Sequence, residues 1–255
     1  MTLSHDAPDG ADGCSPAVQD YLREIYALTR DASAAAEFAA TGDLAGLLAV
    51  RPASVTAMLQ KLAAAHPALI DYHKSRGARL TPAGEKAALA VVRRHRLLEL
   101  YLHQKLGYRW DEVHEEADRL EHVISADLAE RLSAALGRPT HDPHGHPIPA
   151  ADLSLPRATA QPLAGMRLEQ VAVVVSVADR DAAALRELDA VGLRPGARVR
   201  LLSIGSDGAL RVRVGDAGDY VLGRPAADAV LVARPQPDLD KATARPAAAP
   251  ERARP

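Results

Sequence analysis

Residues 41–82 read TGDLAGLLAVRPASVTAMLQKLAAAHPALIDYHKSRGARLTP and contain two short helical patterns followed by two extended ones. The first helical pattern ends at Arg51–Pro52, and the second, residues 53–65, follows at once. Two short helices joined by a tight turn form a helix-turn-helix. The extended runs within residues 69–81 flank Ser75-Arg76-Gly77, which predicts a β-hairpin. A helix-turn-helix followed by a hairpin is a winged helix.

Helical patterns continue on both sides of this segment. Ser15–Pro16 is a typical cap and first-turn pair, and it predicts a helix through Leu28. Thr81–Pro82 begins a long helix whose apolar residues are spaced for burial or dimerisation. We expect two further helices, over residues 110–124 and residues 125–136.

The pattern changes in the last third of the chain. From about Leu168 to Arg234 the sequence consists of short, Val-rich extended runs separated by turns such as Ser206-Asp207-Gly208. One Ala-rich helical segment, residues 182–188, interrupts them. Short strands with repeated turns must close on themselves or be covered, so a small β-barrel is the natural solution.

Composition limits the class of protein. Of 255 residues, 47% are hydrophobic and 25% are charged, as in folded globular proteins. The single cysteine, Cys14, excludes a disulfide framework and a cysteine-based zinc site. The first residues show no basic segment followed by an apolar stretch, and no run approaches the ~18 apolar residues of a membrane span. We therefore expect a cytoplasmic protein with no membrane partner.

The formal net charge of -2 hides two opposed segments. Residues 51–96 hold nine Lys or Arg against two acids, whereas residues 110–130 hold eight acids against one Arg. The basic segment coincides with the second helix and the wing, the elements that contact DNA in winged helices. This coincidence favours DNA binding over the alternative, a solvated basic face.

The acidic segment has regular spacing. His114, Asp118, Glu121 and His122 fall at i, i+4, i+7 and i+8, which places them on one face of a helix. Like charges at such spacing repel each other unless a cation neutralises them. The long helix before them carries His95 and Glu99, again at i, i+4. Metal binding is favoured over the alternative of surface acids with incidental histidines.

The chain resembles a known family, the diphtheria-toxin-repressor family of metal-dependent transcriptional repressors, and specifically its manganese-sensing branch. The resemblance extends from about residue 18 to residue 150, and the barrel is similar to the SH3-like domain of longer members. The matching strings are DYLREIYAL (20–28), RPASVTAMLQKL (51–62), SRGARLTPAGEKA (75–87), RRHRLLE (93–99), VHEEADRLEHVIS (113–125) and HGHPIP (144–149).

The resemblance implies an α+β protein of several parts. Its N-terminal half combines a winged helix-turn-helix with a helical metal-binding and dimerisation domain, and its C-terminal part is a small SH3-like β-barrel. The predicted parts are a disordered N-terminus (1–14), the winged helix-turn-helix (15–81), the helical domain (82–149), a linker (150–165), the SH3-like domain (166–234) and a disordered tail (235–255).

The resemblance also implies metal ligands at two neighbouring sites. One site would use His95, Glu99 and His114, with an acidic ligand from the barrel that is Asp181 or, equally near, Asp179. The other would use Asp20, Asp118, Glu121 and His122. Arg23 departs from the pattern, because small manganese-sensing members place a carboxylate there.

The metal follows from the ligand chemistry. Iron-sensing members carry Met and Cys where this chain has Asp20 and Asp118, and carboxylates favour a hard ion such as Mn(II). We expect about two Mn(II) ions per chain, with Fe(II) as the alternative. His141, His144 and His146 are interpreted as loop residues without a regular element to fix them, not as a metal site.

The implied function is a metal-dependent repressor of manganese homeostasis that binds a palindromic double-stranded DNA operator as a homodimer, and not an enzyme. A di-metal hydrolase and a winged-helix regulator that responds to an organic ligand are the alternatives from other classes. The residues expected to contact DNA come from the second helix and the wing; they are Arg51, Ser54, Thr56, Lys61, Lys74 and Arg76.

Overall fold

The computed structural model describes residues 13–30, 36–156 and 159–235. Nearly all of the predicted disordered N-terminus and C-terminal tail lies outside the described residues. The chain forms two compact units. The first comprises residues 1–99, 115–142 and 147–158, and the second comprises residues 100–114, 143–146 and 159–255. The units cut across the predicted domain boundaries, which remain a prediction.

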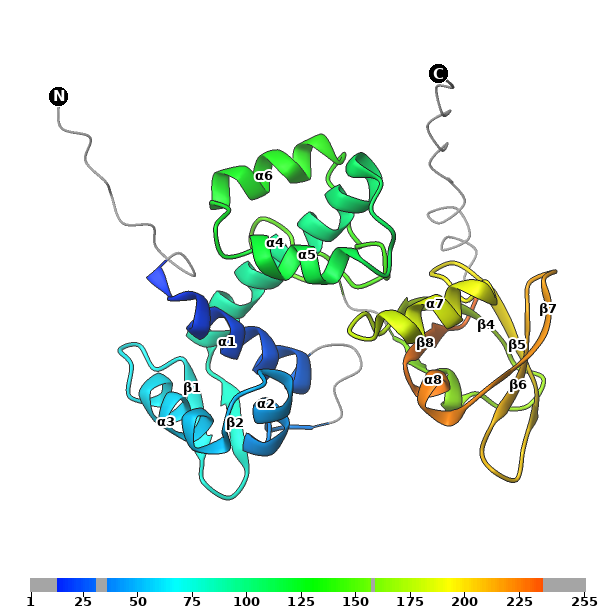
Figure 1. Cartoon of the computed structure of the whole chain (residues 1–255), viewed down its shortest axis with the longest axis horizontal. Coiled ribbons are helices and arrows are strands. Elements are labelled where there is room, and N and C mark those ends of the chain that lie inside the picture. Colours follow the sequence, from blue (N-terminus) through cyan, green and yellow to red (C-terminus); the bar gives the residue numbers. More distant parts are fainter. Residues whose placement is uncertain (1–12, 31–35, 157–158, 236–255) are drawn as a thin grey trace. The chain divides into compact units, whose positions relative to one another are not determined.

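The predicted winged helix is present in the first unit. Arg51 is the N-cap residue of the second helix of the motif, and Pro52 occupies its first turn, where the missing N–H costs nothing. Figure 1 shows the two helices of the motif beside the hairpin, with the first helix of the chain against them. The elements are α1 (Pro16–Thr29), α2 (Thr41–Leu47), α3 (Pro52–Ala63), β1 (Ile70–His73) and β2 (Gly77–Leu80).

A single apolar core holds these elements together. Leu22 and Ile25 of α1, Leu44 of α2 and Leu59 of α3 are completely buried. The wing is attached to the loop before α2, because Ala39 and Ala78 form a bridge through two backbone hydrogen bonds. Gly77 makes this approach possible, since an added Cβ would lie 2.0 Å from the carbonyl oxygen of Ala39.

The helices after the wing differ from the prediction at one place. The long helix α4 (Pro82–Leu106) and the helix α6 (Ala126–Ala135) are confirmed, and the Ser125 hydroxyl caps α6 by accepting from the Leu128 amide. The helix between them, α5 (Val113–Leu120), is shorter than expected at both ends. Glu121 and His122 therefore follow the end of α5 instead of continuing its face.

The second unit contains a six-stranded antiparallel sheet in the order β3-β8-β4-β5-β6-β7. In β6, Leu210, Val212 and Val214 are buried while the arginines between them are exposed, the alternation of a sheet with one covered face. Within the described residues, β3 and β7 are not paired, so the barrel is open. The strands are β3 (Gln161–Pro162), β4 (Val171–Val177), β5 (Arg198–Ile204), β6 (Leu210–Val214), β7 (Gly218–Leu222) and β8 (Val230–Ala233).

The second unit also contains the helices α7 (Ala182–Ala190) and α8 (Arg224–Asp228) and a short 3-10 helix, Leu163–Gly165. Leu185 and Leu188 of α7 join the core of the sheet, and so does Trp110. The sequence indicated α7, but β3 and α8 are too short to produce a periodic pattern. Among the described residues, no helix combines the length and apolarity that crossing a bilayer requires.

Candidate metal centre and nucleic-acid interface

Three predicted ligands meet in the first unit. Asp20 of α1 approaches the turn after α5, and its Oδ1 lies 2.9 Å from His122 Nε2. His122 Nε2 in turn lies 3.6 Å from Glu121 Oε1. One candidate ligand atom from each residue lies within 4.8 Å of the other two. The structure thus brings Asp20, Glu121 and His122 together from segments about a hundred residues apart.

A residue that sequence reasoning missed orients His122. His122 Nδ1 lies 3.0 Å from Gln19 Oε1, an oxygen that can only accept, so the Nδ1–H donates and Nε2 is left as the ring nitrogen that could bind a metal ion. Gln19 is itself fixed, because it donates to the Cys14 carbonyl and accepts from Arg94 Nη2. The Gln19 side chain is buried, only 4% exposed, and lies beside a predicted ligand. Burial of this kind is visible in the structure but not in the sequence.

This donor set fits a hard divalent cation. A donor set of two carboxylates and one imidazole is rich in oxygen atoms, which Mn(II) prefers as ligands. Glu121 Oε1 is buried and has no hydrogen-bond partner among the described residues, so it presents an uncommitted lone pair to the cluster. Burial raises the pKa of Asp20, although His122 and Arg23 act in the opposite direction. A proton and a cation therefore compete for this carboxylate.

His95 and Glu99 form a second cluster on α4. His95 Nε2 lies 3.1 Å from Glu99 Oε1, and His95 Nδ1 lies 2.7 Å from Glu121 Oε2 and 3.2 Å from Asp118 Oδ1. Burial alone would lower the pKa of His95, but the carboxylates of Glu99 and Glu121 outweigh it and raise the pKa. Asp118 thus lies against His95 in this structure.

Arg23 occupies the middle of this second cluster. Its Nη1 lies 3.0 Å from His95 Nδ1 and 3.3 Å from Glu121 Oε2, and it forms a close ion pair with Asp118. The side chain is only 14% exposed. The residue that departs from the family pattern is therefore in direct contact with three predicted ligands.

His114 lies in the second unit, beside a carboxylate of the barrel. Asp179 Oδ2 is 3.3 Å from His146 Nδ1, 3.9 Å from His114 Nδ1 and 4.0 Å from His144 Nδ1. The other candidate, Asp181, is the N-cap residue of α7, where its Oδ1 accepts from the amides of Ala183 and Ala184. The structure therefore places Asp179, and not Asp181, next to the predicted ligand His114.

The interpretation of His144 as an unfixed loop residue is wrong. His144 is completely buried, donates from Nε2 to the Trp110 carbonyl at 2.8 Å and stacks on the Trp110 ring. Its backbone joins β4, because its carbonyl accepts from the Val177 amide. Gly145 allows this contact, since a Cβ there would meet the Val175 carbonyl at 2.0 Å. His141, in contrast, is exposed.

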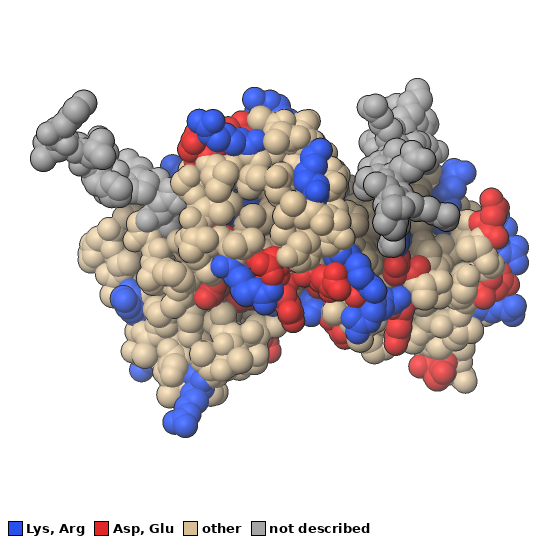
Figure 2. All heavy atoms as spheres, turned by 45° about the horizontal axis from the view of Figure 1, so that its top comes forward, with Lys and Arg blue, Asp and Glu red and all other residues tan. Residues whose placement is uncertain are grey.

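The predicted DNA-contacting residues lie on α3 and on the wing. Arg51, Ser54 and Lys61 are exposed along α3, and basic side chains project from the end of the first unit that carries the wing (Figure 2). Lys74 and Arg76 are exposed in the turn between β1 and β2. Thr56 is half-buried, and its hydroxyl donates to the Pro52 carbonyl.

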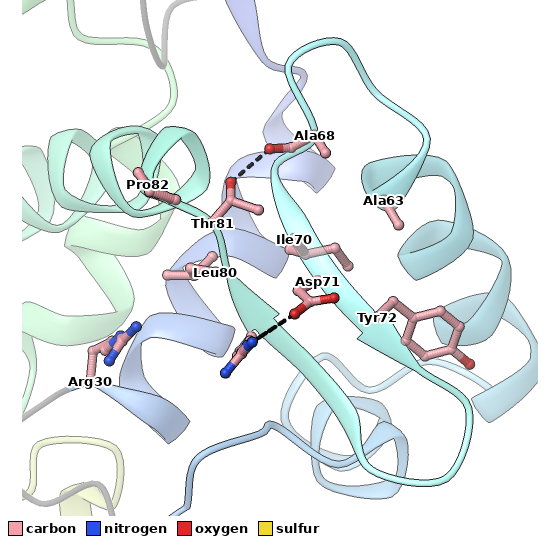
Figure 3. Close-up of a pocket in the computed structure, with 10 residues that line it drawn as sticks. Arg30, Ala63, Ala68, Ile70, Asp71, Tyr72, Leu80, Thr81 and Pro82 are labelled. Atoms are coloured by element: carbon pink, nitrogen blue, oxygen red, sulfur yellow. Dashed lines mark hydrogen bonds and ion pairs between the residues drawn. The ribbon is translucent and has the colours of Figure 1, made fainter.

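Two further residues restrain the wing. Glu37 pairs with Arg76 at 2.8 Å and with Arg79 at 2.9 Å, and both guanidinium groups lie over the Phe38 ring. Arg79 also pairs with Asp71 across the hairpin (Figure 3). Arg76 therefore already forms an ion pair with Glu37 in the absence of DNA.

A cleft of about 540 Å³ lies at the base of the hairpin and is lined by apolar and polar side chains alike.

Comparison with known proteins places this fold. A solved structure described as a manganese-dependent transcriptional repressor in complex with manganese is 38% identical, has a TM-score of 0.79 and covers 85% of this chain and 99% of its own. The HTH-type transcriptional regulator MntR of Bacillus pumilus is 35% identical over 46% of this chain and 77% of that protein. The chain belongs to the diphtheria-toxin-repressor family.

Family models agree with this membership along most of the chain. The model of the N-terminal DNA-binding domain of iron-dependent repressors matches residues 14–78, and that of their metal-binding and dimerisation domain matches residues 81–150. The FeoA domain model matches residues 161–234.

An iron-dependent member of the family also matches. The iron-dependent repressor IdeR of Mycobacterium bovis is 37% identical over 132 residues, which are 47% of this chain and 57% of that protein. The matched segment thus spans a little over half of that relative. The relatives include repressors named for iron and repressors named for manganese.

Proposed function

We propose that this protein is a Mn(II)-dependent repressor that binds a palindromic DNA operator as a homodimer. The observation that carries the proposal is the donor set of Asp20, Glu121 and His122, in which Gln19 fixes the imidazole tautomer. Solved structures described as manganese-dependent transcriptional repressors support the same metal. The iron-dependent relative keeps Fe(II) as the alternative.

The residues of this cluster connect the DNA-binding helices to the rest of the first unit. Asp20 lies on α1, which packs against α2 and the wing, whereas Glu121 and His122 follow α5. These three residues would hold the ion, and its charge would offset the repulsion between their carboxylates. Holding α1 in this way would fix the orientation of α3 and select an arrangement that is competent for DNA binding.

We propose further ligands in each unit. In the first unit they are His95, Glu99 and Asp118, and in the second unit they are His114 and Asp179. Asp179 replaces Asp181 in this role, because Asp181 serves as the N-cap of α7.

We propose that α3 enters the major groove and that the wing contacts the backbone. Arg51, Lys61, Lys74 and Arg76 supply positive charge for phosphates, while Ser54 and Thr56 are short donors for phosphates or base edges. Dimerisation would present two copies of α3 to the two halves of a palindrome.

Fluorescence anisotropy of a labelled fragment from the protein's own promoter tests the proposal. We expect tight binding with Mn(II), weaker binding with equimolar Zn(II), and none after chelation. Binding that is identical with metal and with chelator would contradict the metal dependence. Activation by anaerobic Fe(II) at lower concentrations than Mn(II) would replace manganese by iron.

A further inference from the structure

We propose that Arg23 is an internal cation that stands within the ligand cluster of the metal-free protein and sets how much metal the repressor requires. The inference rests on the proposed function, since it concerns the same cluster. It assigns to Arg23 a role that neither a metal ligand nor a DNA contact has.

The contacts of Arg23 carry the inference. Its Nη1 donates to Asp118 and Glu121 and lies 3.0 Å from His95 Nδ1. Its Nη2 lies 3.5 Å from Glu24 Oε1. A guanidinium that is 14% exposed would not be held among these groups unless the carboxylates offset the cost of its desolvation. Asp118 and Glu121 provide that charge, which a metal ion in the cluster would also need.

Glu121 makes the competition direct. Its Oε2 faces Arg23 at 3.3 Å and His95 at 2.7 Å, whereas its Oε1 faces His122 at 3.6 Å. The two oxygens of one fully buried carboxylate thus point to the guanidinium and to the proposed ion position. A divalent cation at Asp20, Glu121 and His122 would meet a like charge a few ångströms away in a partly buried environment, where such repulsion is weakly screened.

Two consequences follow for the metal-free and metal-bound protein. Without metal, Arg23 offsets part of the repulsion between Asp118 and Glu121, so it stabilises the metal-free fold, but it does not take the place of the ion that would hold α1. With metal, the same positive charge opposes binding, so the protein responds only at a higher metal concentration. The two effects have opposite signs, and a residue that merely packs would not produce both.

The test compares Arg23→Met with Arg23→Lys in the full chain. Mn(II) affinity is measured by competition with a fluorescent chelator, and the melting temperature is measured on protein stripped of metal. We expect Arg23→Met to bind Mn(II) at least about tenfold more tightly while its metal-free form melts at a lower temperature. Arg23→Lys keeps the charge and should retain Mn(II) affinity within about threefold of the wild type.

Arg93→Met is the matched control. Arg93 is 11% exposed, pairs with Glu130 at 2.8 Å and donates to the Pro149 carbonyl, but it contacts none of the proposed ligands in these interactions. Its substitution should lower the melting temperature and leave Mn(II) affinity unchanged. If Arg23→Met does not fold, Arg23→Gln removes the charge and keeps a polar side chain.

The outcomes separate this inference from the proposed function. Mn(II) affinity that is unchanged or weaker in folded Arg23→Met, with a wild type that binds Mn(II), would overturn the internal cation alone. A wild type that binds no Mn(II) beside a variant that does would overturn the proposed function and support the internal cation. Absence of Mn(II) binding in both proteins would overturn the two together.

Discussion

Gln19 fixes the orientation of His122 in the cluster of Asp20, Glu121 and His122. Its side-chain oxygen accepts from His122 Nδ1 and so directs Nε2 toward Asp20. Replacing a residue that hydrogen-bonds to a metal ligand typically lowers metal affinity by about 10–100-fold. We therefore expect Gln19→Leu to weaken Mn(II) binding within that range, measured by chelator competition. Gln19→Glu, which can still accept from His122, should lose less, and equal losses in both variants would contradict the assigned role.

Asp179 and Asp181 form a pair of carboxylates two residues apart with different expected roles. Asp181→Ala removes the N-cap of α7 and should lower the free energy of unfolding by about 1 kcal/mol, with no change in metal stoichiometry. Asp179→Ala should reduce the number of Mn(II) ions bound per chain, as counted by equilibrium dialysis. A reduced count in the Asp181 variant alone would reverse the assignment.

The sequence indicated most of the proposed ligands but not what surrounds them. Helical spacing and motif strings are visible in the sequence alone, and they were enough to propose His95, Glu99, Asp118, Glu121 and His122. The contact of Arg23 with these residues and the support from Gln19 depend on side chains that meet across about 70–100 residues of chain. The buried position of His144 could not be predicted, because a loop that bonds to β4 through a single carbonyl and a close approach at Gly145 leaves no periodic signal.

Asp111 connects the segment before α5 to α7 of the barrel. Burial raises its pKa, but hydrogen bonds from Arg109 and Arg186 outweigh burial, so the pKa is lower than usual. A lowered pKa in the folded state means that the stabilisation is present above the unfolded value, about 3.9, and is lost as the pH falls through the folded value.

Asp111→Asn should therefore destabilise the protein by about 1–3 kcal/mol at pH 7 and by less at pH 3, measured by urea denaturation. The exposed pair of Asp228 and Arg224 provides the control, and Asp228→Asn should change stability by no more than about 0.5 kcal/mol. A destabilisation by Asp111→Asn that is as large at pH 3 as at pH 7 would exclude the ion pair as its cause.

The wing offers a prediction that separates free from engaged basic residues. Lys74 is exposed, whereas Arg76 pairs with Glu37 and lies over Phe38. Lys74→Ala should reduce the slope of log affinity against log salt by about 0.9, the value for one phosphate contact. Glu37→Ala should strengthen operator binding, because it releases Arg76 and Arg79. Unchanged salt dependence in both variants would remove the wing from the interface.

At the level of elements, the sequence predicted those with strong local signals. Proline at the first turn of α1, α3 and α4 marks where each helix begins, and alternation marks β6. The end of α5 was placed too late, because the residues that follow it keep a helical composition although they form a turn. The edge strand β3 was missed, since two residues with a proline resemble a loop.

For the whole molecule, two opposed charge segments are present in a chain whose formal net charge is only -2, and each suits one of the two proposed partners, DNA and a metal ion. One segment, residues 51–96, carries an excess of basic residues over α3, the wing and α4. The acids of the other segment lie around α5, where Arg23 and the proposed ion offset them. The order of winged helix, helical domain and barrel could be predicted from the change from helical to extended patterns and from the motif strings. The membership of residues 100–114 and 143–146 in the second unit could not, because it depends on tertiary packing.

Operator affinity as a function of free Mn(II) is the most direct test of metal-dependent DNA binding. The wild type and Asp20→Ala are titrated against the same labelled operator, with Asp181→Ala as a variant whose proposed ligands are intact. We predict that wild type and Asp181→Ala bind the operator only when Mn(II) is present, and that Asp20→Ala stays inactive at the concentrations that saturate them. Asp20→Ala that is activated like the wild type, or wild type that binds equally well in chelator, would contradict the account.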